Sequence, residues 1–484
     1  MIPRVLAIII TWNKREMLDR MLASLRSSTD MPFDAVVIDN ASTDGTGNMI
    51  RQKHPWVEVI RNEVNLGGTG GFNCGMRHGL NHPKNYDFFW LLDNDVIVHK
   101  GALEALLAPA LADLKVGLVG SAILLLSDPS YVQEAGANVI WSSGGLERQG
   151  EGPIDDTSKS DIKRVDYCAA CSLLARVEAI RKVGLWDPGY FVFWDDIDWG
   201  VRFNRAGWLV VAARRSLVEH ESYFDRRAMQ SPAGTYLCVR NAIYCYHRYA
   251  PALCRPMLFF AHYRRMITVA DNAEAKGALG QARATRRAVA DFLDGRMGRP
   301  PAELDAADPY AREAEPLSGL PAGAAHVRRA ALFARDNAEF ARRIHARLRE
   351  FFPDAVVETL ALNPSGEIKK ECLPDMRVVR IDSIFQRLAL AAAIGLKYDV
   401  VAAPEFFQHF FFENFAARSL RFRGDLTFTE TRRGAARIAR LVWRRLTAWP
   451  RAAWLTMRTL VRPREHVDYF DYGMRKINEA DRLL

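Results

Sequence analysis

The first 245 residues alternate apolar runs with amphipathic stretches. Val5 to Ile10 and Phe88 to Leu92 are continuous apolar runs, which are typical of strands buried on both faces. Lys14 to Arg26 instead carries apolar residues three and four positions apart, which predicts a helix with one buried side. The same reasoning predicts strands at 35–38 and 57–60 and helices at 46–53 and 74–80. This alternation predicts an α/β fold with a mostly parallel sheet covered by helices on both faces.

The chain is long enough for several domains, because 484 residues exceed what one hydrophobic core usually supports. A second α/β pattern begins near residue 326, after a stretch rich in Ala, Arg, Pro and Gly. We therefore expect an α/β domain at 1–250, a helical and Pro/Gly-rich linker at 251–325, a small α/β domain at 326–430 and a basic helical tail at 431–484. The patterns give no role for the small α/β domain.

Composition places the protein among folded globular proteins, with 49% hydrophobic and 25% charged residues. The seven cysteines form no regular framework, which favours a reducing compartment. The apolar runs are too short to cross a bilayer and no secretory leader is visible, so we expect a cytoplasmic protein.

The basic charge is concentrated in one segment. The net charge is +9, but Arg432 to Arg464 contains ten arginines and neither acid nor lysine, so the rest of the chain carries −1. Such localised charge argues against a surface that binds nucleic acid. Apolar residues recur in this segment at helical spacing, namely Ile438, Val442, Leu446, Trp449, Ala453, Met457 and Leu460. We expect an amphipathic helix on the anionic inner face of the cell membrane, with a helix docked on the body as the alternative.

Two carboxylates follow the predicted strand that ends at Leu92. Asp93 and Asp95 are two positions apart, so their side chains share a face at a strand end. Carboxylates this close repel each other unless a cation lies between them, and Mn²⁺ or Mg²⁺ commonly bridges a carboxylate to phosphate groups. The alternative is a solvated turn stabilised by aspartate side chains.

The run from Asn65 to Asn73 contains four glycines in five positions, including Gly67 and Gly68. Glycines let backbone amides approach a ligand closely, and the helix expected from Cys74 favours an anion at its start. Arg77 would add a cation one turn into that helix. We interpret the run as a phosphate contact, with a flexible loop as the alternative.

Two other predicted strand ends carry polar residues. Asp39 follows the second strand and could accept hydrogen bonds from a base or a ribose hydroxyl, and Thr11 and Asn13 follow the first strand. His220 ends a later apolar region. An isolated histidine is usually structural, but this one becomes a ligand candidate because the two carboxylates lack a third partner.

A second group of acids lies a hundred residues further on. Asp195, Asp196 and Asp198 crowd into four positions beside Trp194. Crowding and apolar neighbours both raise the pKa of a carboxyl group, which helps it to take a proton near neutrality. The alternative is that these aspartates cap a helix.

Residues 5 to about 245 resemble the family 2 glycosyltransferases of the GT-A fold. The glycine-rich run and the Trp-Asp-Asp-x-Asp run are most similar to the bacterial galactofuranosyl- and rhamnosyltransferases. The matching pieces, in the family's order, are Thr11-Trp-Asn13, Val37 to Thr46, Asn65 to Asn73, Leu92 to Asp95, Trp194 to Asp198 with Arg202, and His220. Asn94 stands where some relatives carry a third acid, and the chain beyond 325 has no counterpart in short family members.

The resemblance implies inverting transfer from a nucleotide-diphospho-sugar. Asp39 would read the nucleobase, with Thr11 and Asn13 nearby. Asp93, Asp95 and His220 would hold Mn²⁺ or Mg²⁺ on the diphosphate. Asp196 would deprotonate the acceptor hydroxyl. Asp195 and Trp194 would shape the acceptor site, and Asp198 would support the segment.

We therefore expect a membrane-peripheral enzyme of cell-envelope polysaccharide synthesis. The donor would be of the UDP-galactofuranose or dTDP-rhamnose type, and the acceptor a glycan or lipid-linked hydroxyl. A homo-oligomer is one assembly that the sequence allows. The alternative is a non-catalytic scaffold that binds sugar nucleotides, although the intact set of acids argues against it.

Overall fold

The computed structural model describes residues 2–463, apart from the following gaps: 127, 155–160, 221–230, 276–278, 305–325, 335–337, 363–372, 374, 380–385, 387–389, 391–393, 395, 405–417, 423–425, 427 and 433–434. The chain forms two compact units. Unit 1 comprises Met1–Met266, Ala284–Ala306 and Ala452–Leu484, and unit 2 comprises Ile267–Arg283 and Ala307–Arg451. Of the linker expected at 251–325, residues 251–275 and 279–304 are described, and the other residues lie outside the described part of the chain.

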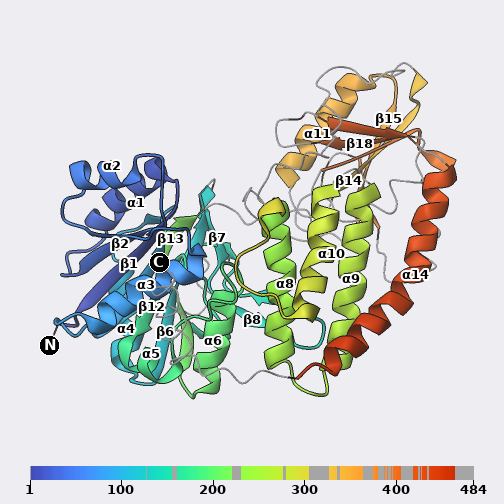
Figure 1. The fold of residues 1–484 in the computed structure, drawn as a ribbon. Helices are drawn as coiled ribbons and strands as arrows, with labels where there is room; N and C mark the ends of the chain where they lie inside the picture. The colour runs from blue at the N-terminus through green and yellow to red at the C-terminus, as the bar shows by residue number, and fades with distance from the viewer. Residues whose placement is uncertain are drawn as a thin grey trace. The chain divides into compact units, whose positions relative to one another are not determined.

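Unit 1 contains an eleven-stranded sheet with the main order β10-β7-β6-β12-β4-β1-β2-β3 (Figure 1). Its strands are β1 (Val5–Thr11), β2 (Asp34–Asp39), β3 (Glu58–Arg61), β4 (Phe88–Asp93), β5 (Ile97–Val98), β6 (Val116–Leu125), β7 (Asp128–Glu134), β10 (Gly152–Pro153), β11 (Ile162–Arg164), β12 (Ser172–Arg176) and β13 (Leu209–His220). A small separate pair joins β8 (Ala137–Val139) to β9 (Leu146–Arg148). Its helices before residue 210 are α1 (Arg15–Ser27), α2 (Thr46–Lys53), α3 (Gly67–Asn81), α4 (Ala102–Ala112), α5 (Val177–Val183) and α6 (Asp195–Arg205).

The alternating side chains of β1 enter two different cores. Ala7 and Ile9 pack with the apolar side of α1, while Leu6 and Ile8 pack with Phe72 of α3 on the opposite face. A strand buried on both faces needs apolar residues at every position, which explains the continuous run in the sequence. The expected α/β class, with helices on both faces of the sheet, is confirmed.

The expected helix start at Cys74 is wrong, because α3 begins at Gly67 and includes the glycine-rich run. Its glycines let the helix lie close to the sheet. A Cβ on Gly75 would be 2.3 Å from Ile8 Cγ2, and one on Gly79 would be 2.5 Å from Phe89 Cε1. Packing therefore outweighs the low helix propensity of glycine in this segment.

Unit 2 contains a six-stranded sheet in the order β16-β15-β14-β17-β18-β19. Its first five strands are parallel, and β19 runs antiparallel to β18. The elements are β14 (Arg329–Ala334), α11 (Ala338–Phe351), β15 (Val356–Leu362), β16 (Met376–Val379), β17 (Val400–Pro404), β18 (Arg418–Phe422) and β19 (Phe428–Arg432). Strands β14 to β17 and helix α11 lie where the sequence pattern predicts them, while the bounds of a small domain at 326–430 stay a prediction.

Long helices account for much of the remaining chain. They are α8 (Pro232–Tyr249), α9 (Arg255–Ala275), α10 (Leu279–Asp294) and α14 (Ala435–Leu460), with a short 3-10 turn, η1, at Ala302–Leu304. Within the described part of the chain, no helix is both long enough and apolar enough to cross a bilayer.

Candidate functional site

Four strands of unit 1 deliver polar side chains to one edge of the sheet. β1, β2 and β4 are mutually parallel, and β12 runs antiparallel to both β4 and β6. Because β13 is parallel to β6, it runs in the same direction as β4. Thr11, Asp39, Asp93 and His220 therefore all end strands at the same edge, where open α/β sheets bind ligands.

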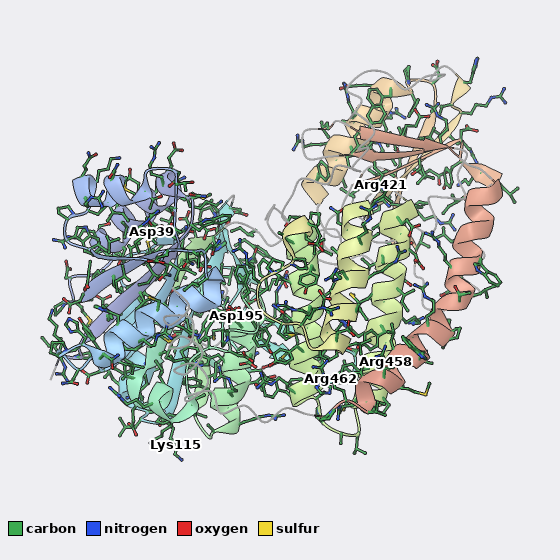
Figure 2. All side chains as sticks on the ribbon, viewed as in Figure 1. Asp39, Lys115, Asp195, Arg421, Arg458 and Arg462 are labelled. Atoms are coloured by element: carbon green, nitrogen blue, oxygen red, sulfur yellow. The ribbon has the colours of Figure 1, made fainter. Side chains whose placement is uncertain are left out.

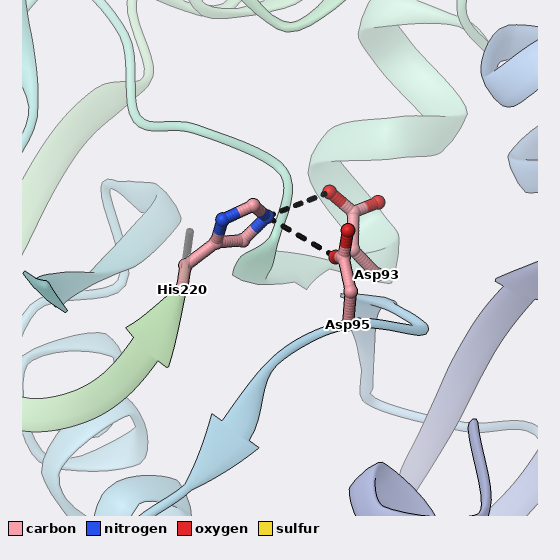
Figure 3. Close-up of side chains that lie close together, drawn as sticks. All are labelled: Asp93, Asp95 and His220. Atoms are coloured by element: carbon pink, nitrogen blue, oxygen red, sulfur yellow. Dashed lines mark ion pairs between the residues drawn. The ribbon is translucent and has the colours of Figure 1, made fainter. Parts of the chain in front are cut away.

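The side chains of Asp93, Asp95 and His220 converge at this edge. One ligand atom from each lies within 4.8 Å of the others. The His220 Nε2 atom is 3.1 Å from Asp95 Oδ1 and 3.9 Å from Asp93 Oδ2 (Figure 3). His220 is buried, while the two carboxylates are partly exposed. Two oxygen ligands and one imidazole within this span fit a Mn²⁺ or Mg²⁺ ion that keeps open positions for a substrate.

The end of β1 is tied to this acidic turn. The Asn94 side-chain amide donates to the Thr11 hydroxyl at 2.8 Å, so Asn94 orients the turn rather than adding a third acid. Asn13 has a φ of 49° and accepts from the Thr43 amide at 2.7 Å. Thr11 and Asn13 thus frame the edge between the acidic turn and the segment after β2.

Asp39 is fully buried at the end of β2. Its Oδ1 accepts from the Ser42 amide at 2.8 Å, and its Oδ2 pairs with the Arg61 guanidinium. Arg61 also donates to the Ser42 carbonyl at 2.8 Å, while about half of its side chain is exposed. The pair therefore presents a cationic group at the surface beside the buried acid.

The residues of the glycine-rich run have several distinct placements. Asn65 accepts from the Gly67 amide at 2.8 Å and so pairs the first amide of α3, which has no partner within the helix. Gly67 has a φ of 73°, and a Cβ there would be 2.2 Å from the Phe191 carbonyl oxygen, while one on Gly68 would be 3.4 Å from Val192 Cγ2. These two glycines therefore pack against the segment before α6.

Because α3 begins at Gly67 and not at Cys74, Asn73 and Arg77 lie further from its start than expected. Asn73 is fully buried and exchanges hydrogen bonds with the backbone of Trp186 at 2.9 and 3.0 Å. Arg77 is ten residues past Gly67, which places it about 15 Å along the helix rather than one turn in. The structure therefore does not bring Arg77 to the start of α3.

The acidic run forms the first turn of α6. Asp195 is the first residue of this helix (Figure 2). The Thr69 hydroxyl donates to Asp195 Oδ2 at 2.6 Å, which links α6 to the first turn of α3. Burial raises the pKa of Asp195 to about 7, and the neighbouring Asp196 carboxylate adds to the rise.

Asp196 lies near enough to Asp93 of the metal-ligand cluster for the charge of Asp93 to affect its pKa. Burial raises its pKa to about 7, and the charges of Glu134 and Asp93 contribute to the increase. Backbone amides of Ile197 and Ala170 bind its carboxylate and partly oppose that effect. The Asp93 amide donates to the carbonyl of Cys171, the residue after Ala170, at 3.2 Å. Asp196 and Asp93 are therefore held against consecutive residues of one backbone segment.

Asp198 is fully buried and lies in a network that supports α6. Its carboxylate binds Arg202 at 2.8 Å and Arg248 at 3.4 Å. The hydroxyls of Tyr190 and Tyr249 donate to it at 3.1 and 2.6 Å. This arrangement gives Asp198 no exposed atoms for a substrate, so it anchors the segment.

Trp194 is partly exposed immediately before α6. Its φ is 68°, and its ring meets that of Tyr246 on α8 edge to face, with centroids 5.2 Å apart. The indole is therefore held beside Asp195 and Asp196 in a fixed orientation. An aromatic ring next to a candidate base can form one wall of a sugar site.

Sequence reasoning missed Arg61, Thr69 and Glu134. The pairing of Arg61 with Asp39 follows from the β2–β3 register, in which these two residues are opposite each other. Glu134 ends β7, and its effect on Asp196 depends on sheet order. The strand before Arg61 was predicted from the sequence, but its neighbour Asp39 was not, and no strand was predicted to end at Glu134.

Comparison with known proteins assigns this region to a family. Residues 3–233 match the family described as "Glycosyltransferase like family 2". The N-acetylglucosaminyl-diphospho-decaprenol L-rhamnosyltransferase of Mycobacterium tuberculosis is 28% identical over 230 residues, which cover 44% of this chain and 74% of that protein. Galactofuranosyltransferase GlfT1 of Mycolicibacterium smegmatis is 24% identical over 204 residues, which cover 42% of this chain and 66% of its own length. Residues 3–233 therefore belong to the family 2 glycosyltransferases.

Proposed function

We propose that unit 1 transfers a sugar from a nucleotide-diphospho-sugar, with inversion, to a hydroxyl of a glycan or lipid-linked acceptor in cell-envelope polysaccharide synthesis. The observation that carries the proposal is the placement of Asp196, a carboxyl group with a pKa of about 7, near Asp93 of the Asp93, Asp95 and His220 cluster. A base and an anion-neutralising site at one edge are the two functions that such a transfer needs.

The residues divide the reaction between them. Ionised Asp196 takes the proton of the acceptor hydroxyl, which attacks the sugar from the face opposite the departing diphosphate and so inverts the anomeric carbon. Asp93, Asp95 and His220 would hold Mn²⁺ or Mg²⁺, which offsets negative charge on the leaving diphosphate when bound. Arg61, which is half exposed and paired with the buried Asp39, would contact the nucleoside, and Trp194 would contact the acceptor.

The donor class follows from the relatives. Their names specify L-rhamnosyl and galactofuranosyl transfer, so dTDP-rhamnose and UDP-galactofuranose are the first donors to test. The test is thermal unfolding of the full chain with each nucleotide-sugar, with and without Mn²⁺ or Mg²⁺. We expect one donor to raise the melting temperature by several degrees only when the cation is present. Equal stabilisation by every donor without a cation would contradict the proposal.

We also propose that α14 binds an anionic membrane surface. Among the described side chains of this helix, the buried ones are small and several large apolar ones are exposed, which is the reverse of the usual arrangement in a docked helix. Its buried positions are small or hydroxylated, namely Ala448, Ala452, Thr456 and Thr459. Its large apolar side chains are more than half exposed, namely Trp443, Leu446, Trp449, Trp454 and Met457. A helix that packs through small residues and exposes three tryptophans is suited to the interfacial layer of a bilayer.

Charge supports the same partner. Arg444 and Arg451 pair with Glu274 and Asp271 of α9 at 2.7 and 3.4 Å, which fixes the first part of α14 within unit 2. Arg458 is exposed and lies over the Trp454 ring at 5.1 Å, near Arg462 at the end of the helix (Figure 2). Arginines beside exposed tryptophans favour anionic headgroups. The side chains of Ile438 and Val442 lie outside the described residues.

Flotation with lipid vesicles tests this surface without removing a packed helix. The triple variant Trp443→Ala, Trp449→Ala, Trp454→Ala should lose most of its flotation. The vesicles should contain about one third anionic lipid, to imitate an anionic membrane leaflet. The matched control is Leu111→Ala with Leu114→Ala, which removes two exposed apolar side chains from the end of α4 and the residues after it. Wild-type protein that does not float, or a triple variant that floats as well as the control, would exclude the surface.

A further inference from the structure

The segment just before α6 has an unusual backbone. Phe191, Phe193 and Trp194 all have φ values of 67–68°, a left-handed conformation that non-glycine residues rarely adopt. Three such residues within four positions persist only when surrounding groups hold them. Because the segment leads directly into Asp195 and Asp196, its conformation sets where the two acids lie.

Two neighbouring residues of α8 hold this backbone. Asn241 is fully buried, and its side-chain amide donates to the carbonyl oxygens of Tyr190, Val192 and Phe193 at 2.9, 2.9 and 2.8 Å. The Asn241 Oδ1 atom accepts from the Arg240 guanidinium at 2.8 and 3.0 Å. The amide orientation is therefore fixed, with its NH₂ group directed at the segment.

Arg240 reinforces the contact from the other side. It is fully buried, and it donates to the carbonyls of Gly189 and Tyr190 at 3.1 and 3.2 Å and to that of Gly298 at 2.7 Å. Its guanidinium also lies over the Tyr236 ring at 5.1 Å. A buried guanidinium constrains the carbonyl groups around it, because moving them away would leave its charge unpaired.

The held segment in turn contacts the start of α3. The Phe191 carbonyl accepts from the Thr69 amide at 3.1 Å, which satisfies one of the amide donors that a helix start leaves unpaired. The Thr69 hydroxyl donates to Asp195. One continuous set of hydrogen bonds therefore runs from α8, through the segment, to both the glycine-rich helix start and the first acid of α6.

We propose that Asn241, oriented by Arg240, is a positioning residue that couples the glycine-rich start of α3 to the acidic start of α6. This inference deepens the proposed function and rests on it for its catalytic consequence. Asn241 is fully buried, so we assign it no contact with either substrate. It fixes the backbone that places Asp196, so its loss lowers turnover more than donor binding.

Asn204 provides a matched control. Its side-chain amide also donates to three backbone carbonyls, those of Val165, Asp166 and Gly200, at 3.1–3.2 Å. None of these belongs to the segment before α6. Asn204→Ala therefore removes the same chemical group with the same kind of partners, and it should affect general stability without moving the acids.

Hydrogen exchange on the full chain tests the coupling without any assay of transfer. In Asn241→Ala, peptides covering 65–73 and 189–198 should exchange at least tenfold faster than in wild type, whereas in Asn204→Ala they should stay within threefold. Unchanged exchange at 65–73 in Asn241→Ala would overturn the inference. If that variant does not fold, Asn241→Ser, which keeps one hydroxyl donor, serves in the same comparison.

Kinetics with a donor that wild type accepts gives the second readout. Asn241→Ala should lose at least 30-fold in kcat with donor KM within threefold, and Asn204→Ala should keep both values within threefold. An equal loss in the two variants would make Asn241 merely structural and overturn the inference. A wild type inactive with every donor would contradict the proposed function, while the exchange result would still decide the coupling.

Discussion

The hydroxyl of Thr69 donates a hydrogen bond of 2.6 Å to the carboxylate of Asp195, across 126 positions of the sequence. Both residues are buried, so the bond joins the first turn of α3 to the first turn of α6 away from water. A hydroxyl donor stabilises the ionised form of a buried carboxyl group, and it lowers the pKa of Asp195 against the larger effect of burial.

Thr69→Val should therefore destabilise the protein mainly above neutral pH. The substitution keeps the shape but leaves the ionised Asp195 without its donor, which costs about 1–3 kcal/mol. The free energy of unfolding, measured in urea, should fall more at pH 8 than at pH 5, where Asp195 is protonated. Thr456→Val is the control, because its hydroxyl donates to the Ala452 carbonyl and no carboxylate is involved. An equal loss at both pH values would contradict the expectation.

The raised pKa of Asp195 also sets the sign of a pH effect on stability. The folded protein binds this proton up to about pH 7, whereas the unfolded chain releases it near the ordinary value of 3.8. Between these values the folded state binds more protons, so the contribution of Asp195 to stability falls as pH rises and is constant above about 7. Measured with a chelator present, Asp195→Asn should gain stability relative to wild type from pH 4 to 7. A constant difference would contradict the raised pKa.

Asp196→Asn should abolish sugar transfer while nucleotide binding survives. The amide keeps the size of the side chain but cannot take a proton at neutral pH. In wild type, kcat should rise with pH through a midpoint near 7, since the ionised form is the active one. Asp30→Asn, at an exposed carboxylate, is the control. A variant of Asp196 that keeps more than a tenth of wild-type turnover would remove this residue from the role of base.

Much of the sheet could be predicted because burial on both faces leaves a strong signal. The continuous apolar runs of β1 and β4 gave their positions, and each ended in the polar residue that now lies at the functional edge. Asp93, Asp95 and His220 could be proposed as one group from chemistry alone. Their convergence depends on β13 being parallel to β4, which no local pattern contains.

Other contacts could not be predicted because they depend on tertiary packing. The helix containing Gly67 was expected to begin later, and its place depends on close packing against Phe191 and against the sheet. Asn241 showed no signal in the sequence. In α14 the helical period was correct, but periodicity alone could not tell that the small side chains face inward. Four of its side chains are buried, as in a docked helix, while its large apolar side chains are exposed, and the membrane interpretation stays a prediction.

Gly75→Ala should destabilise unit 1 despite the higher helix propensity of alanine. The new Cβ would lie 2.3 Å from Ile8 Cγ2, so α3 would have to move away from the sheet. Overpacking of this kind costs about 1–3 kcal/mol. Gly47→Ala in α2 is the control, because its Cβ would meet only the end of Arg51 at 3.8 Å, and it should be neutral or gain about 0.5 kcal/mol. Equal effects in denaturant unfolding would show that helix propensity, and not packing, decides these positions.

His220→Ala should weaken Mn²⁺ binding by at least tenfold. The Nε2 atom of His220 completes a group whose other members are two carboxylates, and removing it leaves their mutual repulsion with one ligand fewer. Titration of Mn²⁺ followed by its electron paramagnetic resonance signal measures the affinity directly, without a sugar donor. His99→Ala is the matched control, because His99 binds Glu219, the residue beside His220, at 2.8 Å but lies outside the cluster. If His99→Ala weakened Mn²⁺ binding as much as His220→Ala does, the effect would come from the end of β13 as a whole, and His220 would not be a ligand.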